Sequence, residues 1–221
     1  MSSRIVDNPP SVPAVEPSER SATVVLDGTF VEASFSGRAT ARPGDVLLHG
    51  SFDCHANWAQ RSQTLRILRL PWWDDDVEGH YRIRDVDLLA RISERDAKEA
   101  TVALRSSLEG ARVCAPDWPE RLAASLSADP SMSLRTWAEL HDLAPATISR
   151  GFRQAFGVTP KMFRLEARTR SAWRAVSRSD QKLTTIAHAL GFSDLAHMSR
   201  SISTFTGRPP SAWRPSRLER S

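Results

Sequence analysis

The sequence predicts an α+β protein, with short strands in its first third and helices in the remainder. Between Thr23 and Tyr81 the chain alternates β-type apolar runs with turn residues, and after Asp85 the apolar residues recur at helical spacing. The last third also contains a pattern that repeats after about 50 residues. With 221 residues and 40% hydrophobic content, the chain is long enough for one or two domains with a buried core.

These patterns divide the chain into five parts. We expect a disordered tail (1–22), a β-sheet domain (23–81), a helical linker (82–117), an all-α domain (118–216) and a short tail (217–221).

The N-terminal tail shows no sign of packed structure. It is polar and carries Pro9, Pro10, Pro13 and Pro17 among charged residues, and it lacks the apolar stretch of a secretory signal. The chain has no run of 18 apolar residues, so we expect a cytoplasmic protein without a membrane partner. Cys54 and Cys114 form no CxxC pair, and in that compartment they are expected to be free thiols.

Three β-type runs follow the tail, namely TVVL, TFVEASF and DVLLHGSF. Asp27-Gly28, Gly37 and Pro43-Gly44 separate them, which predicts a small sheet or partial barrel. Asp85–Gly110 then reads as one helix, although charged residues interrupt its apolar side.

The C-terminal third reads as a series of helices. We expect them at Glu120–Leu126, Leu134–His141, Pro145–Phe156 and Lys161–Ser177, the last with Met162, Leu165, Thr169, Ala172, Trp173 and Val176 on its apolar face. The other sides of that helix carry Arg164, Arg168, Arg170, Arg174 and Arg178.

The stretch from Leu183 to Arg214 reads as two helices around a tight turn. Gly191 allows the turn and Asp194 is a good N-cap. The second helix has an apolar side formed by Leu195, Met198, Ile202 and Phe205.

A shift of 50 residues finds the same pattern upstream. Ser149-Arg150 falls on Ser199-Arg200, and Gly157 falls on Gly207. Before the second helix the offset becomes 49, so that Pro145 matches Asp194. A structural helical hairpin without a binding role would not explain such a repeat, which indicates two helix-turn-helix units.

These residues resemble the DNA-binding domain of AraC/XylS-type bacterial transcription regulators, from about Trp118 to Arg214. The most specific part is I-A-x-x-L-G-F-S-D-x-x-H-M-S-R followed by G-R-P-P-x-x-W-R. The first unit departs from the usual pattern, with Asp142 in place of the turn glycine and Ala144 in place of a serine cap. The resemblance implies two units joined by a long helix, double-stranded DNA as partner, and a place at the bacterial nucleoid. RNA polymerase and a second copy of the chain are further candidate partners.

The resemblance also indicates which side chains meet DNA. In the first unit these are Ala146, Thr147, Ser149, Arg150 and Arg153, and in the second Leu195, Ala196, His197, Ser199 and Arg200. Arg150 and Arg200 can each donate two hydrogen bonds to a guanine edge, or instead clamp phosphate. Residues 131–221 hold 15 Lys and Arg against 6 Asp and Glu, as phosphate binding requires.

The segment RPGDVLLHGSFDCHANWA resembles the second conserved motif of cupin barrels, and in AraC/XylS regulators a cupin-like domain commonly senses a small molecule. About 60 residues suffice only for an abbreviated cupin-like sheet, in which His49, His55 and Trp58 are the candidate effector-binding residues.

His49, Asp53, Cys54 and His55 are competent metal ligands. We nevertheless predict no metal or cofactor, because the first cupin motif with its further ligands has no counterpart upstream. The leading hypothesis is therefore a transcription regulator and not an enzyme. The alternative is a small cupin-type metal-binding protein or enzyme with a helical appendage.

Overall fold

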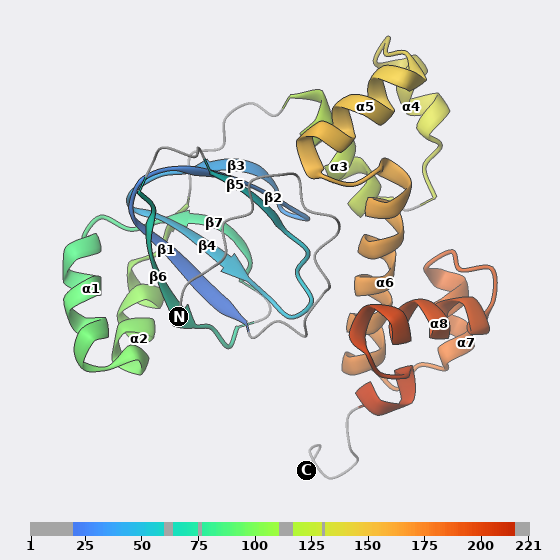
Figure 1. The fold of residues 1–221 in the computed structure, drawn as a ribbon. Helices are drawn as coiled ribbons and strands as arrows, with labels where there is room; N and C mark the ends of the chain where they lie inside the picture. Colours follow the sequence, from blue (N-terminus) through green and yellow to red (C-terminus); the bar gives the residue numbers. More distant parts are fainter. Residues whose placement is uncertain (1–19, 60–63, 75–76, 111–116, 130, 215–221) are drawn as a thin grey trace.

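The computed structural model describes residues 20–59, 64–74, 77–110, 117–129 and 131–214. It has the expected α+β architecture, with antiparallel β-sheets followed by an all-helical part (Figure 1). Cys114, residues 111–116 of the expected helical linker, and the tail 217–221 lie outside the described residues.

The larger sheet has five strands in the order β6-β1-β4-β7-β8, and all its pairs are antiparallel. Its strands are β1 (Ser21–Asp27), β4 (Asp45–His49), β6 (Arg66–Pro71), β7 (Gly79–Arg82) and β8 (Glu109–Gly110). β1 includes Ser21 and Ala22, which pair with His49 and Leu48 of β4. The predicted N-terminal tail was therefore two residues too long, because these residues join the sheet.

The smaller sheet contains β2 (Phe30–Ser34), β3 (Gly37–Ala41) and β5 (Ala56–Ala59) in the order β3-β2-β5. Val25 of β1 and Leu47 of β4 pack with Phe30 and Ala41 of this sheet in one core. Alternate residues of a strand point to opposite faces, so Glu32 lies on the same face as Phe30 and His49 on the same face as Leu47.

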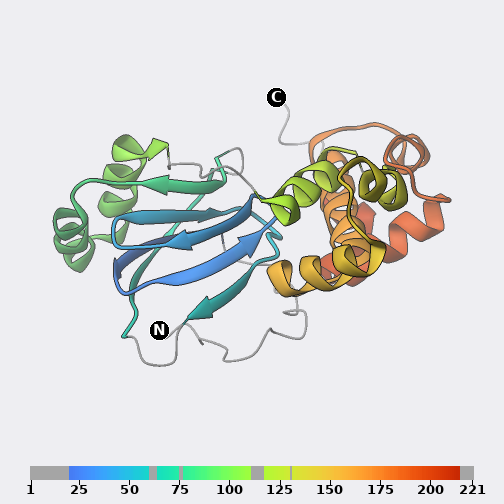
Figure 2. The same ribbon diagram turned by 90° about the horizontal axis from the view of Figure 1, so that it is seen from above.

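Two helices cover the other face of the larger sheet. They are α1 (Val86–Arg95) and α2 (Ala97–Ser107), and Leu89, Ala100 and Leu104 pack there with Val24 and Leu48. Figure 2 shows them at the end of the molecule opposite the helical domain. The prediction of one helix over Asp85–Gly110 was wrong. Asp96 is extended, and its side chain accepts hydrogen bonds from the N–H groups of Lys98 and Glu99 as the cap of α2.

The helical domain is arranged around α6. α3 (Trp118–Ala128), α4 (Leu134–Leu140) and α5 (Pro145–Phe156) lie at one end, and α7 (Leu183–Ala189), α8 (Leu195–Thr206) and the short 3-10 helix η1 (Pro210–Trp213) at the other (Figure 1). α6 itself spans Pro160–Arg178. All the predicted helices of this part are present, with ends that differ from the predicted ones by at most two residues.

The buried face of α6 differs from the predicted one. Met162 and Leu165 are 41% and 36% exposed, whereas Phe163 and Ala167 are buried. Arg170, expected away from the apolar face, is only 6% exposed. The reason is that α6 packs against both the helix-turn-helix units, here also called the reading units, and the sheets. Its contact surface is therefore wider than a single apolar stripe. Among the described residues, no helix is long and apolar enough to cross a bilayer.

Candidate DNA-binding interface

The two helix-turn-helix units have the same turn. In the first, the N–H of Leu143 donates to the carbonyl of Ala138 at 3.0 Å, and in the second the N–H of Phe192 donates to Ala187 at 2.9 Å. Asp142 has φ +50° and Gly191 has φ +70°, so both turns pass through the left-handed region. Asp is one of the few non-glycine residues that tolerate this conformation. The departure at Asp142 therefore leaves the turn geometry intact.

Replacing Asp142 by Gly should raise the free energy of unfolding by about 1 kcal/mol, because glycine removes the left-handed strain. Gly191→Ala is the matched reverse change, since an added Cβ there would meet no atom within 4 Å and only the backbone preference is altered. It should cost about 1–2 kcal/mol. Thermal unfolding followed by circular dichroism measures both, and equal stabilities for Asp142→Gly and the parent would contradict the expectation.

The second helices of the two units also correspond. The N-caps are Ala144 and Asp194, and both helices end at a left-handed glycine, Gly157 or Gly207. Because Ala144 aligns with Asp194, the offset between the two units is already 50 at the N-cap. The sequence match of Pro145 with Asp194 had placed this change one residue later. The buried positions follow the same offset, with Ile148 and Phe152 in α5 matched by Met198 and Ile202 in α8.

α5 exposes all of its predicted DNA contacts. Ala146, Thr147, Ser149, Arg150 and Arg153 are exposed, while Ile148, Phe152 and Phe156 hold the helix in the core. Ala144 makes no side-chain cap, but Pro145 at the first position has no N–H group, so one fewer donor is left unsatisfied at this helix start.

α8 exposes Ala196 and Arg200 fully, and Leu195, His197 and Ser199 in part. Leu195 also packs against the core of its unit, so it serves the fold as well as the surface. The N–H of His197 donates to Asp194 at 2.6 Å, and this bond holds the pKa of Asp194 below its usual range. Ser193 lies 3.1 Å from His197 Nδ1, which orients the imidazole at the start of the helix.

α6 separates the two units. Its 19 residues span about 28 Å at 1.5 Å per residue. Arg168 donates to the carbonyl of Gly191 at 2.8 Å and lies over the ring of Phe192, so α6 grips the turn of the second unit directly. The two reading helices are thus held at opposite ends of one rigid element.

The helix-turn-helix domain family matches residues 137–216 of this chain. The transcriptional activator RhaS from Pectobacterium carotovorum (strain PC1) is 36% identical over 81 residues, which are 35% of this chain and 29% of RhaS. The family match and the similarity to RhaS both identify a helix-turn-helix domain in the C-terminal part of this chain.

Other similarities are more distant. The uncharacterized transcriptional regulator YobQ from Bacillus subtilis (strain 168) is 29% identical over 83 residues, 38% of this chain and 34% of YobQ. A structural match with ToxT from Vibrio cholerae covers 91% of this chain and 91% of ToxT, with a TM-score of 0.44 and 10% identity. For RhaS and YobQ, by contrast, the chain spans only about a third of the relative's length. Their names describe transcriptional regulators and no enzyme.

The helical domain contacts the sheets through the loop between β4 and β5, residues 50–55, here called the β4–β5 loop. Phe52 at its tip is 2% exposed and has φ +55°. Its ring packs edge-on against Trp173 and Trp213, at centroid distances of 4.8 and 5.4 Å, and also lies near Phe205 of α8. The loop therefore inserts an aromatic side chain into the second reading unit. The sequence gives no signal for this contact, because its partners are more than 100 residues away.

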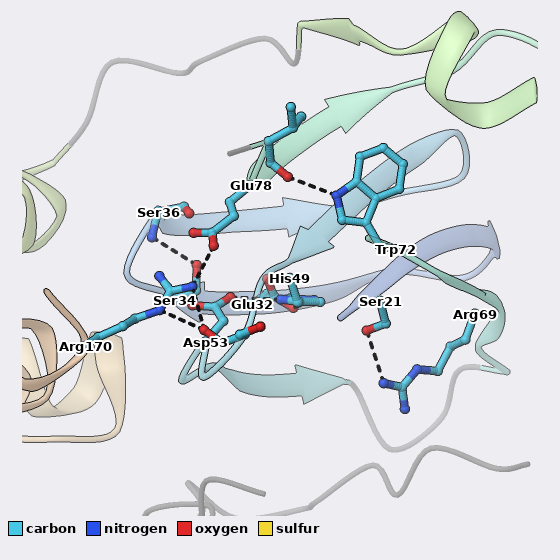
Figure 3. Close-up of polar contacts among 12 residues, drawn as sticks. Ser21, Glu32, Ser34, Ser36, His49, Asp53, Arg69, Trp72, Glu78 and Arg170 are labelled. Atoms are coloured by element: carbon cyan, nitrogen blue, oxygen red, sulfur yellow. Dashed lines mark hydrogen bonds and ion pairs between the residues drawn. The ribbon is translucent and has the colours of Figure 1, made fainter. Parts of the chain in front are cut away.

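A buried arginine makes the second contact between the sheets and the helical domain. Arg170 of α6 donates to the carbonyl of Ser51 through two nitrogens, each at 3.2 Å, and to Glu78 at 2.7 Å (Figure 3). Its guanidinium lies 5.6 Å from the centre of the Phe35 ring, and Arg174 also pairs with Glu78. α6 is therefore bound to residues next to two neighbouring strands of the larger sheet, with Ser51 just after β4 and Glu78 just before β7.

His49, at the base of the β4–β5 loop, lies between two carboxylates. Its Nε2 is 3.3 Å from Glu32 Oε2 and its Nδ1 is 3.0 Å from Asp53 Oδ2, and all three residues are buried. Burial alone would lower the pKa of His49, but the two carboxylates raise it to about 10. Burial likewise opposes ionisation of Asp53, yet its hydrogen bond with His49 leaves the pKa of Asp53 lowered. Glu32 was not among the residues predicted from the sequence, and the only signal for it there was a charged residue at an inward position of a β-run.

The structure does not gather the three candidate effector-binding residues around one cavity. His55 lines a small pocket of about 30 Å³ between the sheets and α5–α6, room for one or two waters. His49 is not among the residues that line this pocket. Its ring stacks on the ring of His55, with the two ring centres 4.1 Å apart. Trp58 packs instead with the core of the first reading unit. Glu166 also lines the pocket, and burial raises its pKa to about 7.

Proposed function

We propose that this protein is a sequence-specific transcription regulator whose two helix-turn-helix units read adjacent major grooves of DNA. The observation that carries the proposal is the equivalence of Arg150 and Arg200. Each lies six residues after the N-cap of its reading helix, each is exposed, and neither forms an ion pair within the described part of the chain. A reading helix with its cap toward the DNA presents such a residue to base edges.

The spacing of the units supports simultaneous binding. Successive major-groove entries lie roughly 34 Å apart on one face of DNA, slightly more than the length of α6. A modest bend of the DNA or a tilt of the reading helices closes the difference. The excess of basic residues in 131–221 supplies the attraction to phosphates and makes binding dependent on salt.

The N-terminal residues are proposed to modulate this activity as a sensor. The support is the direct contact of the β4–β5 loop with α6, α8 and η1 through Phe52 and Arg170. A change in the sheets that moved this loop would move the second unit against the first. The proposed sensor comprises the sheets from Ser21 onward, and the DNA-binding domain begins at Trp118, the first residue of α3.

Replacing Arg200 by Ala should weaken specific DNA binding by about 1–3 kcal/mol and relax the preference at one base pair. The reason is the loss of a bidentate contact to guanine. In vitro selection of bound sequences identifies the motif, and affinities for the selected duplex at several salt concentrations measure the loss. Two half-sites about one helical turn apart are expected for each protomer.

The control is Arg135→Ala, which removes one positive charge from α4. Arg135 is 87% exposed in its side chain and pairs only with Glu139 among the described residues, so its removal should leave the selected motif unchanged. If Arg200→Ala selected the parent motif with merely uniform weakening and a shallower salt dependence, Arg200 would be a phosphate clamp. Failure of the parent protein to select any sequence would overturn the proposed function.

A further inference from the structure

Glu32, His49 and His55 come together in the space between the two sheets. They lie on β2, at the end of β4 and just before β5, and one ligand atom of each lies within 4.8 Å of the others. Glu32 and His49 are 5% and 4% exposed, so the cluster is sheltered from bulk water. Two imidazoles and one carboxylate are a common ligand set for a divalent transition metal.

The surroundings orient these ligands. Asp53 Oδ2 lies 3.0 Å from His49 Nδ1, and it thereby directs Nε2 toward Glu32, 3.3 Å away (Figure 3). A carboxylate behind the far nitrogen of a histidine is the usual second contact of a metal-bound imidazole. His55 Nδ1 is buried and has no hydrogen-bond partner among the described residues. A buried imidazole nitrogen without a partner is costly unless something binds it.

We propose that Glu32, His49 and His55 bind one divalent transition-metal ion with the ligand preferences of Zn²⁺ or Co²⁺. Three protein ligands leave a fourth position for water or a small anion. Bond lengths of about 2.0–2.1 Å require the ligand atoms to close to about 3.4 Å from one another, so the stacked rings of His49 and His55 must tilt apart. The ion takes the place of the Nε2 proton of His49 between the two side chains.

The site is placed to act on the DNA-binding domain. His49 and His55 hold the two ends of the β4–β5 loop, and that loop carries Ser51, Phe52 and Asp53 to α6 and the second reading unit. Metal binding that changes the tilt of the two imidazole rings shifts the loop and its contacts. This regulatory consequence rests on the proposed function, whereas metal binding itself does not.

The test uses the full chain without a histidine tag, stripped of metal and titrated with Co²⁺ and Zn²⁺. One equivalent of Co²⁺ should bind and give the visible absorption of a low-coordinate site. Zn²⁺ at 100 times its Kd should raise Tm by about 5–10 °C. His55→Gln should weaken binding about 100-fold or more, and Glu32→Gln should act in the same direction.

Two variants serve as controls. His80→Gln changes a histidine that pairs with Asp45 in the same sheet, and Cys54→Ser removes the thiol next to His55. Both should keep the parent affinity for metal. His55→Gln keeps the test meaningful if Glu32→Gln fails to fold, because His55 is only partly buried.

The DNA arm measures affinity for a selected duplex with and without one equivalent of Zn²⁺. A change of about fivefold or more is expected in the parent and none in His55→Gln. Absence of stoichiometric metal binding, or parent-like binding by His55→Gln, would overturn the site. Metal binding that leaves DNA affinity unchanged would overturn its regulatory role. A protein that binds metal but no DNA would refute the proposed function and leave the metal site standing.

Discussion

Replacement of Arg170 by Met is expected to lower the free energy of unfolding by roughly 3–5 kcal/mol, the cost of breaking a buried ion pair from one side. Arg170 is 6% exposed, and its loss removes one of the two arginines that pair with Glu78, a cation near Asp53 and the guanidinium donor to the Ser51 carbonyl. Chemical denaturation followed by tryptophan fluorescence measures the change. Because the two domains meet at this residue, the single unfolding transition should also broaden or separate into two.

A double-mutant cycle sharpens the interpretation. Arg170→Met combined with Glu78→Gln should lose less than the sum of the single changes, since neither partner is then left as an isolated charge. Arg135→Met is the matched control on the surface, and loss of its exposed pair with Glu139 should cost less than about 1 kcal/mol. Additive losses in the cycle would show that Arg170 and Glu78 do not act as a pair.

Phe52→Ala is expected to cost roughly 3–5 kcal/mol, as for other fully buried aromatic residues. The ring fills the space between Trp173, Phe205 and Trp213, so the truncation leaves a cavity in the second reading unit. Alanine keeps the cost of the positive φ, and the loss therefore reports the ring and not the backbone. The same denaturation experiment gives its size.

Phe52→Gly separates the two contributions further. Glycine loses the same ring but adopts φ +55° freely, so it should be no less stable than Phe52→Ala despite its greater flexibility in the unfolded chain. Val102→Ala, at a side chain 61% exposed on α2, should change stability by less than about 0.5 kcal/mol. A loss at Phe52 no larger than that at Val102 would contradict the contact between loop and reading unit.

The reading units could be predicted from the sequence because their information is local. The apolar steps Met198, Ile202 and Phe205, the cap at Asp194 and the turn at Gly191 all act within about fifteen residues, and the repeat supplied a second copy. The prediction that these helices exist is confirmed. The assignment of individual side chains to bases or phosphates stays a prediction, since it depends on the DNA.

The contacts between domains could not be predicted because their partners are far apart in the chain. Arg170 meets Ser51 across 119 residues and Glu78 across 92. In the sequence Arg170 was one of several arginines on a basic helix, and nothing local distinguished it. Glu32 was likewise hidden, because its partner His49 lies on a different sheet.

The break at Asp96 had a visible signal that was outweighed. Charged residues interrupted the apolar side of the expected helix, and an aspartate followed by Lys98 and Glu99 is a good start for a new one. The apolar residues on both sides kept helical spacing, which favoured one continuous helix. The periodicity identified the helices correctly, and the capping residue decided where one ends and the next begins.

The shared cores have a consequence for dividing the chain. Ala33 of β2 and Phe35 in the turn after it belong to the same apolar cluster as Phe152 and Phe156 of α5 and Phe163 of α6. A fragment that begins at α3 would expose part of that aromatic surface to water. It would also expose the surface of Trp173, Phe205 and Trp213 that Phe52 covers in the full chain. Grafting the two helix-turn-helix units onto another N-terminal domain would therefore require new side chains to fill both places. The sequence composition separates the β-sheet part from the helical domain, but the apolar cores of the folded protein include residues of both.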